Sequence, residues 1–370
     1  MRLYAAATIA LVGVFIASCG GGEASDASFA PVSGDAGGAS GRGGAGGSAG
    51  TVALAGSGGT SGKGGASGAA GSGGMPLGPP YPIVLCHGFF GFEKFAGVDF
   101  VTYFYGVKDH LAQDGETLVF TPAVDPFNSS LVRGAQLTAK VQEILAQTGY
   151  PKVNLIAHSQ GGLDARVVAH DHPEMIASVT TIATPHYGTP VADVVLKLEA
   201  NPNAQLVIDG LVQAVGSALY DTTGKTTSLA KSMQQMSSDG IAKFNADYPN
   251  VQGIPYFSLT GRSSGSNGKP DCQLPDAPGF IAKYDSVNDP INTLLSPTGS
   301  LLSGDGATPA PNDGLVRAKD AKWGKFLGCI PGDHFDEIGQ ILGAGPGLGN
   351  TFQYLPMYSD LVKYLRAQGL

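Results

Sequence analysis

The stretch VNLIAHSQGGLDARVV, residues 153–168, constrains the fold of this chain more than any other segment. Its first half is an apolar run typical of a buried strand, its second half has the spacing of a helix, and Ser159 stands at the junction. A serine on so sharp a strand-to-helix turn adopts a strained backbone conformation and tolerates only small residues two positions away. Ala157 and Gly161 meet that requirement. Small residues around a serine are a weak signal alone, but their place between a strand and a helix predicts that Ser159 is a nucleophile.

Two further apolar runs, Pro82–Cys86 and Val179–Thr184, have the length of strands. Strands that are apolar on both faces belong to parallel sheets covered by helices. Helical patterns lie between these runs at Ser130–Gly149 and Asp164–His172, and another strand-like run follows at Gly253–Gly261. The alternation predicts an α/β fold with a mostly parallel sheet and helices on both faces.

The first residues predict export. Arg2 precedes an apolar run that ends in small residues before Cys19, as in a bacterial lipoprotein signal. We therefore expect residues 1–18 to be a signal peptide and Cys19 to be lipidated. The mature protein would be anchored to a bacterial membrane, at the outer membrane or cell surface, or released from it. An ordinary signal peptide with an incidental cysteine is the alternative. A membrane-spanning helix is disfavoured, because the apolar run is shorter than the roughly 20 residues that such a helix needs.

Residues 19–75 are rich in Gly, Ser and Ala and cannot bury enough apolar surface to fold, so they predict a flexible tether. Residues 76–370 then form one catalytic domain, which we expect to be a monomer. The formal net charge is −8, and no stripe of Lys and Arg is present. Both observations argue against nucleic acid as a partner.

Between residues 191 and 248 the pattern changes to amphipathic helices, one at residues 203–220 and one at Ser228–Phe244. The apolar stripe of the first helix either packs on the sheet or belongs to a mobile lid that shields a pocket. We expect a helical lid insertion at about 191–248. The tail, residues 352–370, has the pattern of a closing helix.

A serine nucleophile needs a base and an acid. In serine hydrolases built on a parallel sheet, the acid and then the base follow the nucleophile along the chain. Of the seven histidines only His334, in PGDHFDEIGQ, lies late enough, although a surface histidine could also stand there. The candidate acids are the aspartates between the two: Asp285, Asp289, Asp305, Asp313 and Asp320. Asp313, on a turn before a short apolar run in PNDGLV, is preferred, and Asp305 is the main alternative.

The segment CHGFFGF follows the first apolar run and predicts part of an oxyanion hole. The backbone N–H groups of Phe89 and of Gln160, next to the nucleophile, are the expected donors. Each such donor contributes on the order of 3 kcal/mol to catalysis. The alternative is an ordinary glycine-rich turn after a strand.

The four cysteines fit an oxidising compartment. Cys86 lies inside an apolar run and is expected in the core. Cys272 and Cys329 lie in loop-like surroundings, and we expect them to form a disulfide worth roughly 4 kcal/mol.

Several motifs occur together and in order: YPIVLCHGFFGFEKFAGV, KVNLIAHSQGGLDAR, IASVTTIATPHYGTPVAD, NDGLV and HFDEIGQILG. With them the chain resembles, over residues 81–345, the true bacterial lipases of the Pseudomonas–Burkholderia type. The resemblance implies an α/β-hydrolase fold with the triad Ser159, Asp313 and His334. It also implies the oxyanion donors named above, a lid near residues 200–225 and hydrolysis of long-chain triacylglycerols.

The resemblance further implies a structural Ca²⁺ ion that steadies the loop of the catalytic histidine. The matching positions are the carboxylates of Asp289 and Asp336 and the carbonyl oxygens of Gln340 and Ala344. Two carboxylates with carbonyl oxygens suit a hard cation. Taken without the resemblance, Asp336 could simply cap a helix.

The chain departs from this family at three places. Ala157 stands where many members have Gly, and the second cysteine that usually follows the acid is absent, with Lys319 near its position. A bridge between Cys272 and Cys329 would thus differ from the family's own. The predicted anchor and tether are unlike the freely secreted members, which leaves open whether a membrane-bound folding chaperone serves this chain.

Together these features predict a serine ester hydrolase that uses an acyl-enzyme intermediate, most simply a triacylglycerol lipase acting at a lipid–water interface. A short-chain carboxylesterase or a polyester depolymerase has the same chemistry and stays open. The alternative from another class is a non-catalytic surface lipoprotein with a hydrolase-like fold.

Overall fold

The computed structural model describes residues 77–89, 103–199, 228–263, 271–272, 274–293, 295–304, 309–340, 343, 345–346 and 349–370. The predicted signal peptide, the lipidated Cys19 and the tether lie outside these residues. Asp305, Ala344 and the middle of the predicted lid also lie outside these residues. The structure does not test the predictions made for these segments.

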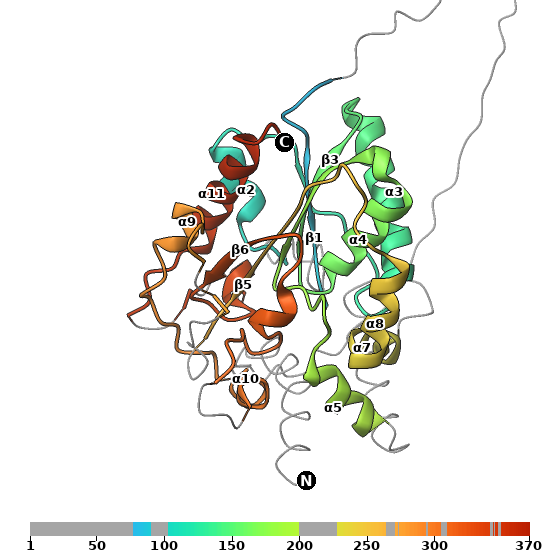
Figure 1. The fold of residues 1–370 in the computed structure, drawn as a ribbon. Coiled ribbons are helices and arrows are strands. Elements are labelled where there is room, and N and C mark those ends of the chain that lie inside the picture. The colour runs from blue at the N-terminus through green and yellow to red at the C-terminus, as the bar shows by residue number, and fades with distance from the viewer. Residues whose placement is uncertain are drawn as a thin grey trace, which may run out of the picture. The chain divides into compact units, whose positions relative to one another are not determined.

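The described part of the chain contains one sheet of six parallel strands in the order β2–β1–β3–β4–β5–β6 (Figure 1). The strands are β1 (Ile83–Cys86), β2 (Val119–Phe120), β3 (Val153–His158), β4 (Ile176–Ile182), β5 (Tyr256–Gly261) and β6 (Lys325–Ile330). Every residue of β1, β3, β4 and β5 is buried, which explains why these strands are apolar on both faces. The prediction of a parallel sheet is confirmed.

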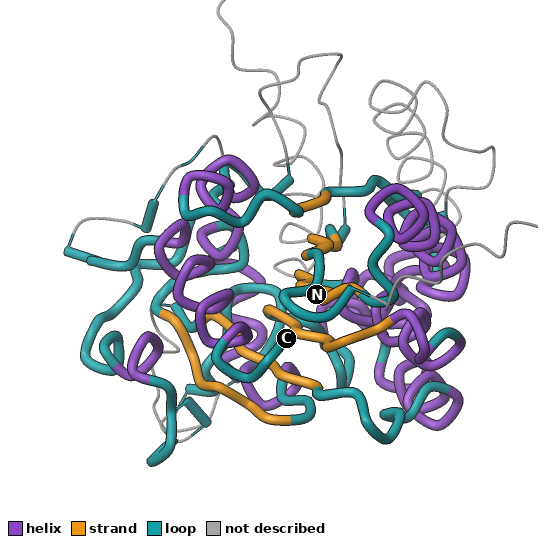
Figure 2. The backbone as a smooth tube through the Cα atoms, turned by 90° about the horizontal axis from the view of Figure 1, so that it is seen from above, coloured by secondary structure: helices purple, strands orange, loops and turns teal. Residues whose placement is uncertain are grey.

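Helices cover both faces of this sheet (Figures 1 and 2). One face carries α3 (Ser130–Thr148) and α4 (Gly161–Asp171), and the other carries α2 (Val107–Gln113), α9 (Gly279–Ala282) and α11 (Tyr354–Arg366). Successive residues of a strand serve the two faces in turn: Leu155 packs with α3 and α4, and Ile156 with α2 and α11. Burial of each such side chain contributes about 2 kcal/mol.

The remaining elements include α10 (Ser296–Ser303) and the short 3₁₀ helices η1 (Pro173–Met175), η2 (Ala318–Ala321) and η3 (Asp336–Ile338). None of the described helices is both long and apolar enough to cross a membrane. η1 links α4 to β4, whereas η2 and η3 lie in the segments that follow Asp313 and His334.

The described ends of the predicted lid are helical and packed against the domain. They are α5 (Pro190–Glu199), α7 (Leu229–Met236) and α8 (Ser238–Asp247). Val191 of α5 and Leu229 of α7 share an apolar cluster with Leu163 of α4. The single helix predicted for Ser228–Phe244 is wrong in one respect, because it breaks at Ser237, whose extended backbone and side chain cap α8 through the N–H of Gly240.

Candidate active site

Ser159 lies on the turn between β3 and α4 and has a φ of 54°, in the left-handed region that non-glycine residues rarely adopt. Two hydrogen bonds hold this strained turn. The N–H of Ser159 donates to the carbonyl of Ile182 (2.9 Å), and the hydroxyl of Thr184 donates to the carbonyl of Ser159 (2.7 Å). The strained backbone predicted from the small flanking residues is present.

Two glycines allow the loop after β1 to press against this turn. A Cβ atom at Gly161 would lie 2.5 Å from the carbonyl oxygen of Cys86. A Cβ atom at Gly88 would lie 2.6 Å from the Cβ of Ser159. Since neither approach is possible for a residue with a side chain, the contact itself requires glycine at both positions.

Asp313 and His334 form a buried pair. Nδ1 of His334 lies 2.8 Å from Oδ2 of Asp313, and the backbone N–H of His334 donates to the Asp313 carbonyl (2.9 Å). The other carboxylate oxygen accepts the N–H groups of Leu315 (2.8 Å) and Val316 (2.6 Å). The imidazole donates its Nδ1 proton in a hydrogen bond to this carboxylate, so the lone pair of Nε2 can accept a proton.

Two other described candidate acids have different partners. Asp320 pairs with Arg317, and Asp289 accepts a hydrogen bond from Ser263 at 2.7 Å. Of the aspartates considered from the sequence and described by the structure, Asp313 is therefore the one brought to His334.

A buried layer connects His334 to the nucleophile turn. The ring of His158, the residue before Ser159, lies 4.4 Å from the ring of His334. The Nδ1 of His158 is 2.7 Å from the Tyr103 hydroxyl, and its Nε2 is 2.8 Å from Oε2 of Glu337. Burial lowers the pKa of His158 and raises the pKa of Glu337 well above its usual value. The pair is thus most stable with both side chains uncharged, sharing one proton.

Sequence reasoning missed this layer. His158 and Glu337 are 179 positions apart, and Tyr103 is 55 positions from His158, so no local pattern joins them. The one available signal was that His158 directly precedes Ser159 and that Glu337 follows His334 by three positions.

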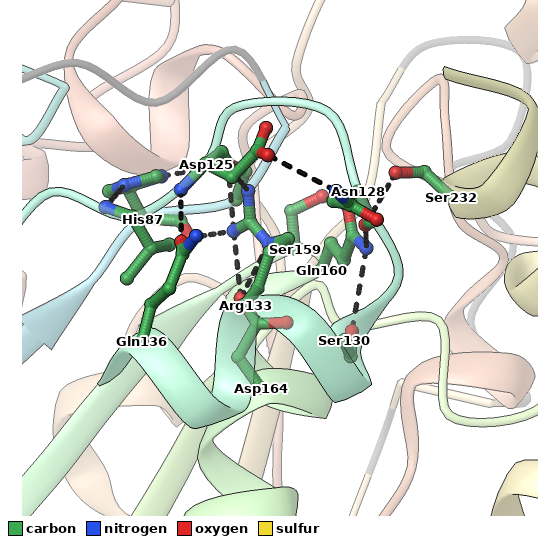
Figure 3. A network of polar contacts seen from close by, with 12 residues as sticks. His87, Asp125, Asn128, Ser130, Arg133, Gln136, Ser159, Gln160, Asp164 and Ser232 are labelled. Atoms are coloured by element: carbon green, nitrogen blue, oxygen red, sulfur yellow. Dashed lines mark hydrogen bonds and ion pairs between the residues drawn. The ribbon is translucent and has the colours of Figure 1, made fainter. Parts of the chain in front are cut away.

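The two predicted oxyanion donors lie on either side of the nucleophile turn. Phe89 directly follows Gly88, and its ring meets that of Phe127 edge-on at 5.3 Å. Gln160 is the N-cap residue of α4, and its side-chain amide donates to the carbonyl of Asn128 at 2.7 Å (Figure 3). This contact ties the side chain of Gln160 into the fold and leaves its backbone at the start of the helix.

Three buried aspartates lie close to His334. Carboxylate oxygens of Asp289, Asp333 and Asp336 are all within 4.8 Å of one another. Burial, followed by the charges of Asp333 and Asp289, raises the pKa of Asp336 to about 8. Burial is also the main reason why the pKa of Asp289 rises to about 6. Such a cluster is unfavourable for anions alone and could hold a metal ion.

This cluster contains two of the predicted metal ligands, Asp289 and Asp336, and one residue that was not predicted, Asp333. Gln340 lies nearby in sequence, and its side chain donates to the carbonyl of Tyr103 at 2.9 Å. Ala344 lies outside the described residues.

The predicted cysteine bridge is present in the structure. Cys272 and Cys329 are joined across 57 positions, with Cα atoms 5.1 Å apart. Cys329 lies on β6 and packs with Ala318, which follows Asp313 in the chain. Cys86 is a free thiol buried in the core, as expected.

Comparison with known proteins identifies the fold and the family of the chain. Residues 81–214 match the family model of the alpha/beta hydrolase fold. A triacylglycerol lipase of Vibrio cholerae is 34% identical over 78% of this chain and 89% of its own length. A second triacylglycerol lipase, from Pseudomonas fragi, is 30% identical over 78% of this chain and 97% of its own.

Two solved structures share the fold at low sequence identity. A mature Bacillus licheniformis lipase covers 77% of this chain and 94% of its own, with a TM-score of 0.50 and 21% identity. A metagenomic carboxyl esterase covers 80% of each chain, with a TM-score of 0.52 and 15% identity.

The sheet, the position of Ser159 on the turn between β3 and α4, and these matches define an enzyme of the α/β-hydrolase class that acts on carboxylic esters. Within that class the chain belongs to the family of bacterial triacylglycerol lipases. The predicted fold class and the predicted ester-hydrolase activity are confirmed.

Proposed function

We propose that the protein hydrolyses long-chain triacylglycerols through an acyl-enzyme formed on Ser159, with His334 as the base and Asp313 as its acid. The names of its relatives in Vibrio and Pseudomonas support the substrate class. The observation that carries the catalytic assignment is the buried contact between Nδ1 of His334 and Asp313, with the His334 ring 4.4 Å from the ring of His158, the residue before Ser159.

In the proposed reaction, Nε2 of His334 takes the Ser159 proton while the serine oxygen attacks the ester carbonyl. Asp313 keeps the proton on Nδ1 and stabilises the imidazolium ion. The N–H groups of Phe89 and Gln160 hold the oxyanion. His334 then protonates the leaving alcohol, and a water molecule releases the fatty acid by the same steps.

The test measures rates on a triacylglycerol series from tributyrin to triolein, beside soluble short esters. We expect a clear gain when substrate forms an interface, and loss of activity in Ser159→Ala but not in Ser300→Ala, a change at an exposed serine on α10. Equal rates on soluble short esters without an interfacial gain would assign a carboxylesterase instead. A fluorophosphonate probe that fails to label Ser159 would point to a non-catalytic binding module.

The cluster of Asp289, Asp333 and Asp336 fits a structural Ca²⁺ ion. Calcium prefers carboxylate and carbonyl oxygens, and a divalent cation would neutralise the repulsion that raises the pKa of Asp336. The carbonyl oxygens of Gln340 and Ala344 are the further ligands we propose. When bound, the ion would supply positive charge that fixes the loop after β6; the protein's own groups carry out the chemistry.

Further proposals concern the predicted lid, the N-terminal segment and the assembly of the protein. A lid spanning about 191–248 would expose an apolar face to lipid, with α5, α7 and α8 as its attachments. A lipid on Cys19 and the tether of residues 19–75 would hold the domain near a bacterial membrane. We propose that the protein is an exported, anchored monomer. Whether it needs a folding chaperone is tested by expressing the chain alone and measuring whether active enzyme forms.

A further inference from the structure

Two side chains hold the carbonyl oxygen of Gly88. Nδ1 of His87 lies 2.9 Å from this oxygen, and an Nη2 of Arg133 lies 3.2 Å from it. In a trans peptide the C=O of one residue and the N–H of the next point in opposite directions. Fixing the carbonyl of Gly88 therefore also fixes the direction of the Phe89 N–H.

This peptide lies directly against the nucleophile. A Cβ atom on Gly88 would sit 2.6 Å from the Cβ of Ser159 and 2.9 Å from the carbonyl oxygen of His158. A small rotation of the peptide between Gly88 and Phe89 would thus redirect the N–H relative to the reacting carbonyl. Hydrogen bonds to an oxyanion weaken steeply when the donor is misaligned.

His87 is suited to hold the peptide in one orientation. Its Nε2 accepts the backbone N–H of Val124 at 2.9 Å. Since a backbone N–H can only donate, Nε2 carries no proton, and the proton of the neutral ring sits on Nδ1, where it donates to the carbonyl of Gly88. Burial, aided by the charge of Arg133, lowers the pKa of His87 to about 3, so the ring stays neutral near pH 7.

Arg133 is fully buried and connects the same loop to the helix that follows the nucleophile (Figure 3). Its Nε donates to Asp164 of α4 at 2.8 Å, and Nη2 donates to the carbonyl of His87 at 2.8 Å. Nη1 donates to the carbonyl of Asp125. One guanidinium thus fixes the loop that carries Phe89 relative to α4, the helix whose N-cap is Gln160.

We propose that His87 and Arg133 are positioning residues for the oxyanion hole, which pin the Gly88 carbonyl so that the Phe89 N–H faces the reacting ester. They act through the backbone and do not touch the substrate. The proposal rests on the proposed function, because it assigns a task within the same reaction.

A matched pair of variants separates the two nitrogens of His87. In His87→Asn the amide nitrogen can take the place of Nδ1 and still donate to the Gly88 carbonyl, while the contact to Val124 is lost. In His87→Gln the amide oxygen can take the place of Nε2 and still accept from Val124, while the donor to Gly88 is lost. A merely structural histidine would not distinguish these variants in kcat.

We expect His87→Gln to lower kcat on soluble p-nitrophenyl butyrate by about ten- to a hundredfold, part of the loss seen when an oxyanion donor is removed. KM should stay within about twofold. The affinity for an alkyl boronic acid, which forms a tetrahedral anion on the serine, should fall in proportion to kcat. His87→Asn should keep a kcat several-fold higher than His87→Gln. Arg133→Lys, which can keep the charge pair with Asp164 but lacks the guanidinium fork, should also lose kcat at nearly constant KM.

Equal kcat values in the two His87 variants, or a wild-type kcat in His87→Gln, would overturn the assignment of His87. If His87→Gln does not fold, Arg133→Lys decides the proposal by the same measurements, and a loss in KM alone would overturn it. His170→Gln, a change at a partly exposed histidine of α4, serves as the control. Failure of the proposed function is a separate result, namely a wild-type protein no more active than Ser159→Ala.

Discussion

The rings of His158 and His334 lie 4.4 Å apart, and one carboxylate oxygen of Glu337 is 2.8 Å from His158 Nε2 and 4.0 Å from His334 Nδ1. The pKa of Glu337 is raised by burial and, next, by the charge of Asp313. A carboxyl group kept neutral beneath the base adds no second negative charge beside Asp313. The negative charge that stabilises the imidazolium ion of His334 is then the charge of Asp313.

Glu337→Gln should therefore be tolerated, because the amide is also neutral and can hydrogen bond to His158. We expect the free energy of unfolding at pH 7 to change by less than about 1 kcal/mol, whereas Glu337→Ala should cost about 3 kcal/mol through a cavity and an unpaired His158. Urea unfolding measures both. Glu143→Gln, at a side chain that is 57% exposed, is the control. If Gln is as damaging as Ala, Glu337 is ionised in the folded protein.

The neutral state of His87 predicts a pH-dependent stability. In the unfolded chain its pKa is near 6.5, and in the folded protein it is about 3. Above pH 6.5 His87 is neutral in both the folded and the unfolded chain, so it does not make the free energy of unfolding depend on pH. As pH falls from 6.5 towards 3, the unfolded chain binds a proton that the folded protein does not, so folding loses about 1.4 kcal/mol per pH unit.

His87→Asn lacks this proton uptake. The variant should be less stable than the wild-type protein at pH 8, and the difference should shrink steadily below pH 6. Denaturant unfolding at several pH values follows the difference. A gap that stays constant between pH 8 and pH 4 would show that His87 is not held neutral.

The sequence was sufficient for the interior of the sheet, because a strand buried on both faces must be apolar at nearly every position. It was insufficient at the edges. β2 has only two residues, and the short run of β6 follows the exposed Lys325 and contains Gly328, a residue type that is disfavoured in strands. The break at Ser237 was also missed, because the helical spacing continues through it while the capping hydroxyl acts locally.

The residues of the candidate site also differ in how far the sequence alone predicts them. Ser159 was predictable from steric needs within five residues, and His334 from its order in the chain. The turn before a short apolar run favoured Asp313, but several aspartates satisfy the same order, so the sequence pattern left alternatives that the contact with His334 decides among the described residues. Arg133 and Glu337 were not predictable, because their partners are brought near only by the packing of α3 and of the loop after β6.

The disulfide between Cys272 and Cys329 should stabilise the segments that carry the acid and the base. Cys329 lies on β6, five residues before His334, and packs against Ala318 beyond Asp313. A closed loop of 57 positions corresponds to about 4 kcal/mol in the chain-entropy model. Cys272→Ser should lower the unfolding free energy by up to this amount, and reductant should bring the unfolding midpoint of the wild-type protein to the same level.

The double variant Cys272→Ser, Cys329→Ser separates the bridge from the individual thiols. It should resemble Cys272→Ser closely and be insensitive to reductant. Cys86→Ala keeps the bridge, so its response to reductant should match that of the wild-type protein. A reductant effect that survives in the double variant would mean that another bond is being reduced.

The acidic cluster gives a test of the proposed calcium ion that does not depend on activity. At a Ca²⁺ concentration about 100 times Kd, binding to the folded state alone stabilises by about 2.7 kcal/mol, which raises Tm by roughly 5–10 °C. Asp336→Asn should abolish the difference between calcium and chelator, while Asp171→Asn, at an exposed position, should keep it. In chelator, Asp336→Asn should be about as stable as the wild-type protein, because a carboxyl group with a pKa of about 8 is already largely neutral at pH 7 and the amide is neutral too. A chelator that leaves the wild-type Tm unchanged, or an Asp336→Asn variant that still responds to calcium, would place the ion elsewhere or remove it from the proposal. The dependence on calcium distinguishes a metal ligand from a residue that only shapes the local turn, since the effect of losing such a residue would be the same with and without calcium.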